Sequence, residues 1–339
     1  MKGKKTAAIL LAMTLAATAL GGCGKIKPEE TAVTVDQTEI SMGFANFAAR
    51  YQQAMYDQYY VQMMGEKAWQ QESSTTKGET LEDETKDQIM NTLQQWALLD
   101  ANKETYHVSV TEEEQKKITE TAQQFLEDNS EEAIRQLGAT QAYVEKMLYY
   151  YLLESKMKEA MAAEADVSVS DEDAAQRTFS YIVFNVENYK DENQQTVAYT
   201  EEEAAEKLKQ AKADAQKAKT DFDAVAKAWN YENVTYSYGA DEENMAEEVI
   251  EEADALKAGE VSDLIETQDG MYYVIRLDSE FDKKATEKKK EQLAEQQQSE
   301  HIQTVLDTWK KDAKISVNKS EWKKVKFDEL FTVVTGASK

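Results

Sequence analysis

The first half of the chain has apolar residues at the spacing of amphipathic helices. Ala32–Val35 alternates like a strand, and after a turn Ser41 stands where a helix cap is expected. The apolar stripe of this first helix consists of Phe44, Phe47, Tyr51, Met55 and Tyr59. The polar segment Ser73–Glu84 contains Gly78 and is predicted to be a loop. Such stripes most simply form a core, but the cluster Phe44–Met64 is rich enough to leave part of a groove exposed.

Three more amphipathic helices are predicted before residue 166. The core face of the first carries Ile89, Leu93, Trp96 and Leu99. The second begins after Thr111, which forms a capping-box pattern with Glu114, and runs to about Asn129. The third runs from Thr140 to about Ala165. This half of the chain is therefore expected to be almost entirely helical.

The pattern changes near Val167. Two β-rich runs, Phe179–Phe184 and Met271–Leu277, enclose a short strand candidate at Val234–Tyr236. The helices predicted between them are Glu201–Lys219, a short one from Asp221, and Met245–Lys257, which stops at Gly259. The order of strand, helices, strand, helix and strand predicts a small α+β domain of about a hundred residues.

The chain closes with a long charged helix and an apolar tail. The helix is predicted over Lys283–Lys311, and the tail, Ile315–Lys339, is too apolar for pure disorder because it holds Trp322, Phe327 and Phe331. The whole chain is thus predicted to be α+β and mostly helical.

The amino terminus has the pattern of a secretion signal. Lys2, Lys4 and Lys5 form a positive region, and Ala7–Leu20 is an uncharged apolar run. This run is shorter than the ~20 residues that span a bilayer, so a permanent transmembrane helix is the weaker interpretation.

The run leads into Leu20-Gly21-Gly22-Cys23, which resembles the lipobox of a bacterial lipoprotein. The resemblance implies lipid transfer to Cys23, removal of residues 1–22, and an extracytoplasmic protein anchored to the bacterial cell membrane. A chance cysteine beside an ordinary signal peptide is the alternative.

Composition excludes several classes of function. The chain has 39 Lys and Arg against 65 Asp and Glu, a formal charge of −26, which argues against a nucleic-acid partner. One Cys and two His cannot form an internal disulfide or a Cys- or His-rich metal site, so neither metal nor cofactor is predicted. The sequence also has no P-loop, dinucleotide fingerprint, serine nucleophile elbow or HExxH motif.

One phrase points to a family. Leu256–Gly270 reads LKAGEVSDLIETQDG and is followed by a β-run. It closely resembles the closing segment of parvulin-type peptidyl-prolyl isomerases, in which L-x-x-G-E-V-S leads through T-x-x-G into the last strand. Phe179–Phe184 is similar to the first strand of that family, and Phe222–Trp229 to its F-x-x-L-A helix. The resemblance covers roughly residues 177–282.

With the lipobox and the helical first half, the chain resembles PrsA-type foldase lipoproteins, relatives of the chaperone SurA. The resemblance implies a helical SurA-like chaperone module, made of the N-terminal half and the C-terminal helix, with an inserted parvulin-like domain. The expected boundaries are 1–22 for the signal peptide, 23–32 for the tether, 33–170 for the helical segment, 171–282 for the parvulin-like domain and 283–339 for the returning helix and tail.

The resemblance also implies a pocket for the proline ring. Tyr181 stands at the position of the first-strand His, and Tyr272, or Tyr273 if the turn is one residue longer, at that of the last-strand His. Met245 falls on the pocket Met and Val249 on the pocket Phe.

This chain keeps only part of the family's equipment. Its two His, His107 and His301, lie outside the domain, so both pocket His positions are Tyr. Tyrosine can donate and accept a hydrogen bond, so a Tyr pair would substitute in part. Weak or absent isomerase activity is the expectation, and efficient activity is the alternative.

The sequence therefore predicts a membrane-anchored foldase or chaperone that binds unfolded or partly folded secreted proteins and carries a parvulin-type domain. A homodimer is compatible with this interpretation. The alternatives are a solute-binding lipoprotein of a transporter, which would show alternating βα units around parallel sheets, and a structural envelope- or spore-assembly factor with a degenerate domain.

Overall fold

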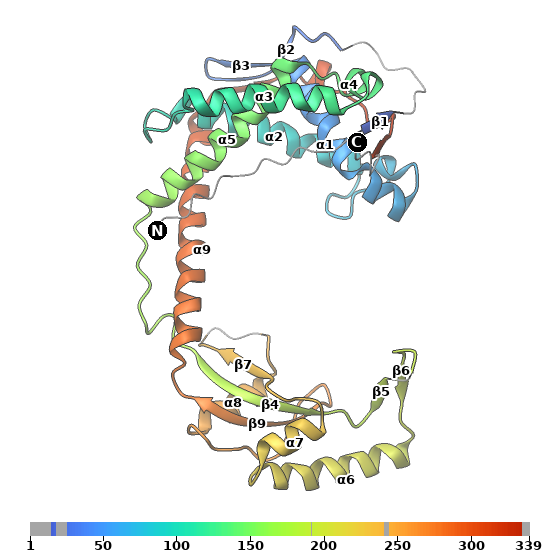
Figure 1. Ribbon diagram of the computed structural model, residues 1–339, viewed down its shortest axis with the longest axis vertical. Helices are drawn as coiled ribbons and strands as arrows, with labels where there is room; N and C mark the ends of the chain where they lie inside the picture. The colour runs from blue at the N-terminus through green and yellow to red at the C-terminus, as the bar shows by residue number, and fades with distance from the viewer. Residues whose placement is uncertain (1–14, 18–25, 191, 241–243, 334–339) are drawn as a thin grey trace. The chain divides into compact units, whose positions relative to one another are not determined.

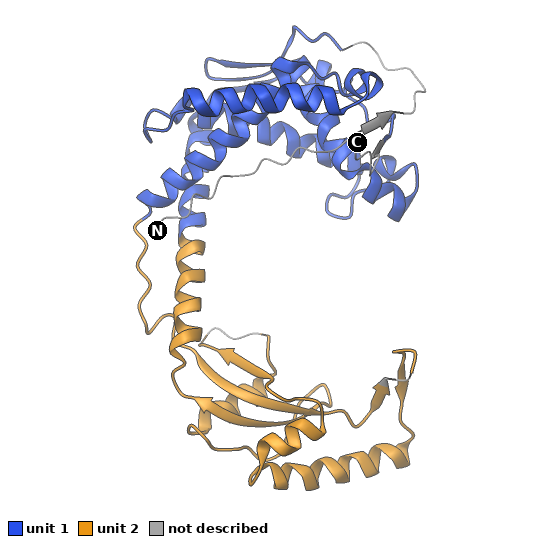
Figure 2. Cartoon of the chain, viewed as in Figure 1, with its two compact units in different colours: residues 1–165, 298–339 blue, residues 166–297 orange. Residues whose placement is uncertain are grey.

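The computed structural model describes residues 15–17, 26–190, 192–240 and 244–333. The chain divides into two compact units (Figure 2), unit 1 with residues 1–165 and 298–339 and unit 2 with residues 166–297. The predicted lipid-anchor residue Cys23 lies outside the described residues. Among the residues described, no helix combines the length and apolarity needed to cross a membrane.

Unit 1 is built mainly of helices (Figure 1). They are α1 (Met42–Met64), η1 (Ala68–Gln70), α2 (Leu81–Asn102), α3 (Glu112–Asp128), α4 (Glu131–Leu137), α5 (Gln141–Glu164), the second half of α9 (Lys283–Asp312) and α10 (Lys319–Trp322). Three predicted caps are confirmed: the hydroxyls of Ser41, Thr111 and Thr140 accept main-chain hydrogen bonds at the starts of α1, α3 and α5. The helical nature of this half follows from local signals.

The start of α2 and the whole of α4 differ from the prediction. The loop predicted over Ser73–Glu84 ends early because Thr80 and Asp83 form a capping box that starts α2 at Leu81. The seven-residue helix α4 was not predicted, although Ser130 caps it and Gly138, at φ 66°, ends it. Both helices follow from side chains that satisfy free main-chain groups at helix ends.

The tail completes a small antiparallel sheet of unit 1. Strand β10 (Ile315–Val317) pairs with β2 (Thr31–Val35), which pairs with β3 (Thr38–Ser41). A second pair joins β1 (Leu15–Ala17) to β11 (Phe331–Val333). The first and last parts of unit 1 are therefore held together by main-chain hydrogen bonds.

Buried aromatic rings fill the core of unit 1. Phe44, Phe47 and Trp69 are fully buried. Trp96 stacks on Tyr150 with ring centroids 5.2 Å apart. Burying such rings stabilises unit 1, and the stripe of α1 forms a core at Phe44, Phe47 and Tyr51 as its spacing predicted. Met55 and Tyr59, also expected in this stripe, are 38% and 58% exposed, so the C-terminal part of the stripe lies outside the core.

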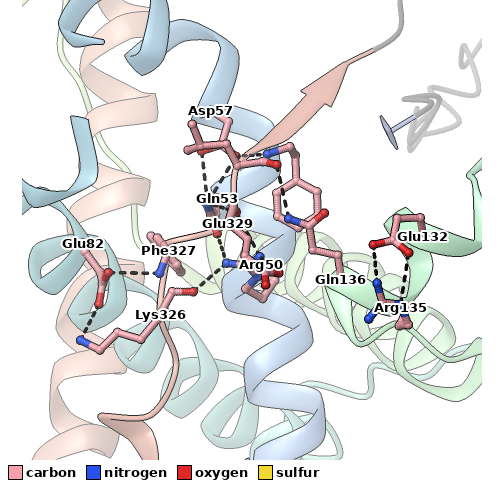
Figure 3. Close-up of polar contacts among 12 residues, drawn as sticks. Arg50, Gln53, Asp57, Glu82, Glu132, Arg135, Gln136, Lys326, Phe327 and Glu329 are labelled. Carbon is pink, nitrogen blue, oxygen red and sulfur yellow. Dashed lines mark hydrogen bonds and ion pairs between the residues drawn. The ribbon is translucent and has the colours of Figure 1, made fainter. Parts of the chain in front are cut away.

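Polar side chains of α1 and α2 hold the tail in place (Figure 3). The guanidinium of Arg50 donates to the main-chain oxygens of Lys326 at 2.6 Å and Glu329 at 3.1 Å. The carboxylate of Glu82 accepts a hydrogen bond from the main-chain nitrogen of Phe327 at 3.1 Å. Arg50 and Glu82 are buried, so these bonds are shielded from water and fix the path of the tail.

Unit 2 contains a four-stranded antiparallel sheet in the order β7-β4-β9-β8. The strands are β4 (Arg177–Phe184), β7 (Thr235–Tyr238), β8 (Ile265–Glu266) and β9 (Tyr272–Ser279). One core lies between the sheet and the helices α6 (Glu201–Ala218) and α7 (Phe222–Ala228), and the other between the sheet and α8 (Glu247–Ala255). The predicted α+β arrangement, mostly helical over the whole chain, is confirmed.

A small hairpin, β5 (Asn188–Lys190) with β6 (Thr196–Ala198), precedes α6. The sequence showed only a polar segment there, because three-residue strands are too short for an alternating pattern. The hairpin, like every strand pair among the described residues, is antiparallel. The parallel βα units expected of a solute-binding lipoprotein are therefore absent from the described part of the chain.

Candidate functional site

A hollow of about 460 Å³ opens on the face of the unit 2 sheet that carries α8. Its lining consists of Tyr181, Val183, Tyr231, Asn244, Met245, Ala246, Asp269 and Tyr273. Most of these residues are apolar or aromatic, with a few polar atoms among them. Such a composition is typical of a site that binds a small apolar group in a fixed orientation.

The pairing of β4 with β9 brings two tyrosines to this hollow. Tyr181 lies opposite Ile275 and Val183 lies opposite Tyr273, so the two tyrosines are diagonal neighbours on one face. Their ring centroids are 6.4 Å apart. A third ring, Tyr231 from the segment between α7 and β7, lies 5.8 Å from that of Tyr181. The three phenols therefore form one wall of the hollow.

Tyr272 lies on the other face of the sheet. It stands opposite Phe184 and contacts the core formed with α6 and α7. Its hydroxyl donates to a carboxylate oxygen of Glu266 at 2.9 Å. Because side chains alternate along a strand, Tyr272 and Tyr273 cannot both face Tyr181, and the structure brings Tyr273 to it.

The two predicted apolar pocket residues have different places. Met245 is half-buried just before α8 and lines the hollow. Val249, on the first turn of α8, is fully buried and packs in the same core as Phe179 and Ile275. Val249 is therefore part of the core between the sheet and α8, whereas the side chain of Met245 borders the hollow.

The ionisation of the lining groups follows from their surroundings. Desolvation raises the pKa of Tyr231, and also that of Tyr273, where Asp269 adds to the shift. Both phenols are therefore neutral at neutral pH and can donate a hydrogen bond. The hydroxyl of Thr267, with the main-chain nitrogen of Met271, lowers the pKa of the Asp269 carboxyl, which stays ionised.

Five of the eight lining residues were not predicted as pocket residues from the sequence: Val183, Tyr231, Asn244, Ala246 and Asp269. Asp269 occupies the turn before β9, where Gly270 has φ 80°, a conformation that favours glycine. The turn itself was predicted, and the position of Asp269 in it was the available signal. Tyr231 comes from a loop, and its place beside Tyr181 had no local signal.

Among the described residues, no histidine and no metal-binding group lies at this site. His107 and His301 both belong to unit 1. Among the same described residues, no group of three or more His, Cys, Asp or Glu is placed to hold a metal ion. The hollow can therefore seat an apolar ring and hydrogen-bond an amide beside it.

Comparison with known families identifies this unit. Residues 169–286 match the PPIC-type PPIase domain. The chain carries a PPIC-type domain. The hollow described above lies within that domain, on the sheet face shared by β4, β9 and α8.

The comparison with whole proteins agrees. Foldase protein PrsA of Clostridium perfringens (strain SM101 / Type A) is 27% identical over 259 residues, which cover 68% of this chain and 71% of that protein. The chain is thus PrsA-like, with a PPIC-type domain, and the resemblance stated from the sequence is confirmed.

Solved structures of similar proteins include a foldase and a peptidylprolyl isomerase. Foldase protein PrsA from Lactococcus lactis is 15% identical with a TM-score of 0.38, over 88% of this chain and 98% of that chain. The peptidylprolyl isomerase PrsA from Bacillus cereus is 20% identical with a TM-score of 0.32, over the same shares of the two chains.

Proposed function

We propose that this protein is a membrane-anchored extracytoplasmic foldase, which binds partly folded secreted polypeptides and accommodates their proline residues in unit 2. The observation that carries the proposal is the hollow in the PPIC-type domain, where Tyr181, Tyr273 and Met245 come together. The name of the Clostridium relative, foldase, supports the same function for this chain.

The chemistry proposed for the hollow is the rotation of an X–Pro bond. Amide resonance puts a barrier of ~18–20 kcal/mol on this rotation, so it takes tens to hundreds of seconds without catalysis. The proline ring would lie against Met245, away from water, while a neutral phenol of Tyr273 or Tyr231 donates to the twisted amide. This favours the transition state, which has lost its double-bond character.

We propose that the isomerase activity is weak. A phenol supplies one hydrogen bond, typically worth about 1 kcal/mol net. Its raised pKa keeps it neutral near pH 7, where an imidazole can change its charge, so the phenol acts only as a neutral hydrogen-bonding group. Proline binding with modest acceleration is therefore the expected behaviour of this domain.

Unit 1 has an exposed apolar surface suited to client binding. The C-terminal part of α1 carries Met55, Tyr56, Tyr59, Met63 and Met64, which are 37–65% exposed. These are five of the seven large hydrophobic side chains that are exposed in the described part of the chain. Methionine is flexible and polarizable, so such a surface adapts to apolar segments of varied sequence.

The membrane anchor is proposed to be a lipid on Cys23. The four residues Leu20–Cys23 and the apolar run before them support it. The test is the variant Cys23→Ala in a bacterial host: we expect the protein to leave the membrane fraction and appear in the medium. A variant that stays in the membrane fraction would contradict the lipid anchor and leave the foldase proposal intact.

Two assays on the mature chain with Cys23→Ser test the foldase proposal. The first measures the cis/trans relaxation of a proline peptide, where a small but saturable acceleration is expected. The second measures aggregation of a denatured secreted enzyme, which the protein should suppress at stoichiometric amounts. An uncatalysed relaxation rate would remove the isomerase part, and unchanged aggregation would remove the chaperone part.

A further inference from the structure

Three carboxylates lie in or beside the turn at residues 268–270, and one of them lines the hollow. Asp269 lines it directly from the turn between β8 and β9. Glu248 of α8 accepts a hydrogen bond from the main-chain nitrogen of Gln268 at 3.2 Å. Glu187, after β4, lies so close to the turn that a Cβ on Gly270 would meet its carboxylate at 3.3 Å.

The lining of the hollow has no basic side chain to neutralise the carboxylate of Asp269. None of the eight lining residues is basic. Tyr231 also borders a neighbouring hollow that contains Arg276. That guanidinium is already engaged, since it donates to Asp278 and to Asp223, each at 2.8 Å. Among the eight described lining residues, Asp269 therefore carries the only formal charge, and it is negative.

Asp269 is held in a fixed position at the wall. Its carboxylate accepts hydrogen bonds from the Thr267 hydroxyl and, at 3.4 Å, from the main-chain nitrogen of Met271. These bonds stabilise the charged form and leave carboxylate lone pairs directed to solvent. Since Met245 and Tyr273 line the same hollow, a chain segment with its proline ring against Met245 passes beside Asp269.

We propose that Asp269 is a specificity-determining residue of this hollow, which selects proline segments that carry Lys or Arg next to the proline. The inference rests on the proposed function, namely that the hollow accommodates proline. Adjacent Cα atoms are 3.8 Å apart, so a long basic side chain beside the proline reaches a carboxylate on the same wall. Glu187 and Glu248 add to the attraction through the field they produce.

The test compares three peptides that differ in one residue: Lys-Pro, Ala-Pro and Glu-Pro in the same flanking sequence. Their dissociation constants are measured by fluorescence anisotropy on the mature chain with Cys23→Ser. We expect binding in the order Lys, Ala, Glu, with about three- to tenfold between the extremes because the pair is solvent-exposed. The difference should shrink in 0.5 M salt, where charges are screened over a few ångströms.

Two variants assign the effect. Asp269→Asn should lose the preference for lysine, so that it binds Lys-Pro and Ala-Pro about equally. Asp263→Asn is the matched control, because Asp263 is an exposed carboxylate of the same unit that pairs with Lys219 and does not line the hollow. Asp263→Asn should keep the wild-type order of affinities. Thermal unfolding verifies that both variants are folded.

If Asp269→Asn unfolds unit 2, Asp269→Glu, which keeps the charge, must retain the order, and raised salt alone must still remove it. Equal affinity of the wild type for all three peptides would overturn the inference and leave proline binding standing. A full Lys preference in Asp269→Asn would also overturn it. Loss of proline binding itself, seen as equal affinity for Ala-Pro and Ala-Ala peptides, would instead overturn the proposed function.

Discussion

The buried carboxylate of Asp57 accepts a hydrogen bond from the indole nitrogen of Trp69 at 2.6 Å. The same carboxylate accepts a hydrogen bond from the main-chain nitrogen of Phe331 at 2.6 Å. Helix α1, the segment after it and the end of the tail therefore meet at one ionisable group. Because a buried charge is expensive, the stability of this junction depends on pH.

Asp57→Asn is predicted to change how the stability of unit 1 depends on pH. Desolvation raises the pKa of Asp57 above its ordinary value, so the folded state holds this proton more tightly than the unfolded state. The resulting stabilisation is fully present below the unfolded pKa of about 4 and is lost as pH rises through the folded pKa.

The free energy of unfolding of the wild type, relative to that of Asp57→Asn, should therefore fall as pH rises. The fall should be about 1.4 kcal/mol for each unit by which folding raises the pKa of Asp57. Urea unfolding between pH 4 and pH 8, followed by tryptophan fluorescence, measures this difference. Glu329→Gln is the control, since its side chain is partly exposed near Arg50. A difference that does not change with pH would refute the assignment to Asp57.

Phe327→Ala is predicted to loosen the tail. Phe327 is fully buried, and its ring meets that of Trp69 edge-on with centroids 4.8 Å apart. Removing a buried Phe ring costs about 3–5 kcal/mol. Chemical denaturation should show this loss for unit 1. Phe281→Ala is the matched control, because Phe281 is 44% exposed and its removal should cost little. A small loss of stability in Phe327→Ala would mean that the packing of the tail does not stabilise the core of unit 1.

The contacts of the tail with α1 could not be predicted from the sequence. Helix starts such as Ser41 and Thr111 were predictable because the cap and the main-chain groups it satisfies are three residues apart. Arg50 and Asp57 lie on α1 at positions that suggest a solvated face, yet both are buried. Their partners in the tail are more than 270 residues away along the chain. No local pattern reports such a contact.

The site was predictable in part for the same reason. The closing phrase that leads to Gly270 located the last strand, and strand pairing then put Tyr181 beside β9. The choice between Tyr272 and Tyr273 required the register of the β4–β9 pairing, because a shift of one residue along a strand places a side chain on the other face of the sheet. Tyr231 enters from a loop, so only the folded structure brings it to Tyr181.

Tyr273→Phe and Tyr272→Phe are predicted to differ in proline isomerisation. Tyr273 lines the hollow, whereas the Tyr272 hydroxyl is engaged with Glu266 on the opposite face. Loss of one hydrogen bond of about 1 kcal/mol should slow the catalysed relaxation about fivefold in Tyr273→Phe. Tyr272→Phe should match the wild type. The opposite order of rates would mean that the catalytic face is the one toward α6.

Met245→Ala and Val249→Ala are predicted to have different effects, the first on peptide binding and the second on the stability of unit 2. Met245 is half-buried and lines the hollow, so its loss should weaken binding of an Ala-Pro peptide with little change in thermal unfolding. Val249 is fully buried, so its loss should cost about 1–3 kcal/mol of unit 2 stability through lost burial and a cavity. Peptide anisotropy and denaturation on both variants measure the two effects. Equal loss of stability in both would contradict a ligand-contact role for Met245.

The double variant Tyr59→Ser with Met63→Ser tests the exposed surface of α1. These side chains are 58% and 65% exposed, so replacing them removes apolar surface with little effect on the core. We expect the variant to unfold at the wild-type temperature but to suppress client aggregation several-fold less per mole, because apolar contact with the client is lost. Tyr189→Ser is the matched control, since Tyr189 is 43% exposed in unit 2. If the double variant protects clients as well as the wild type does, clients bind elsewhere on the protein.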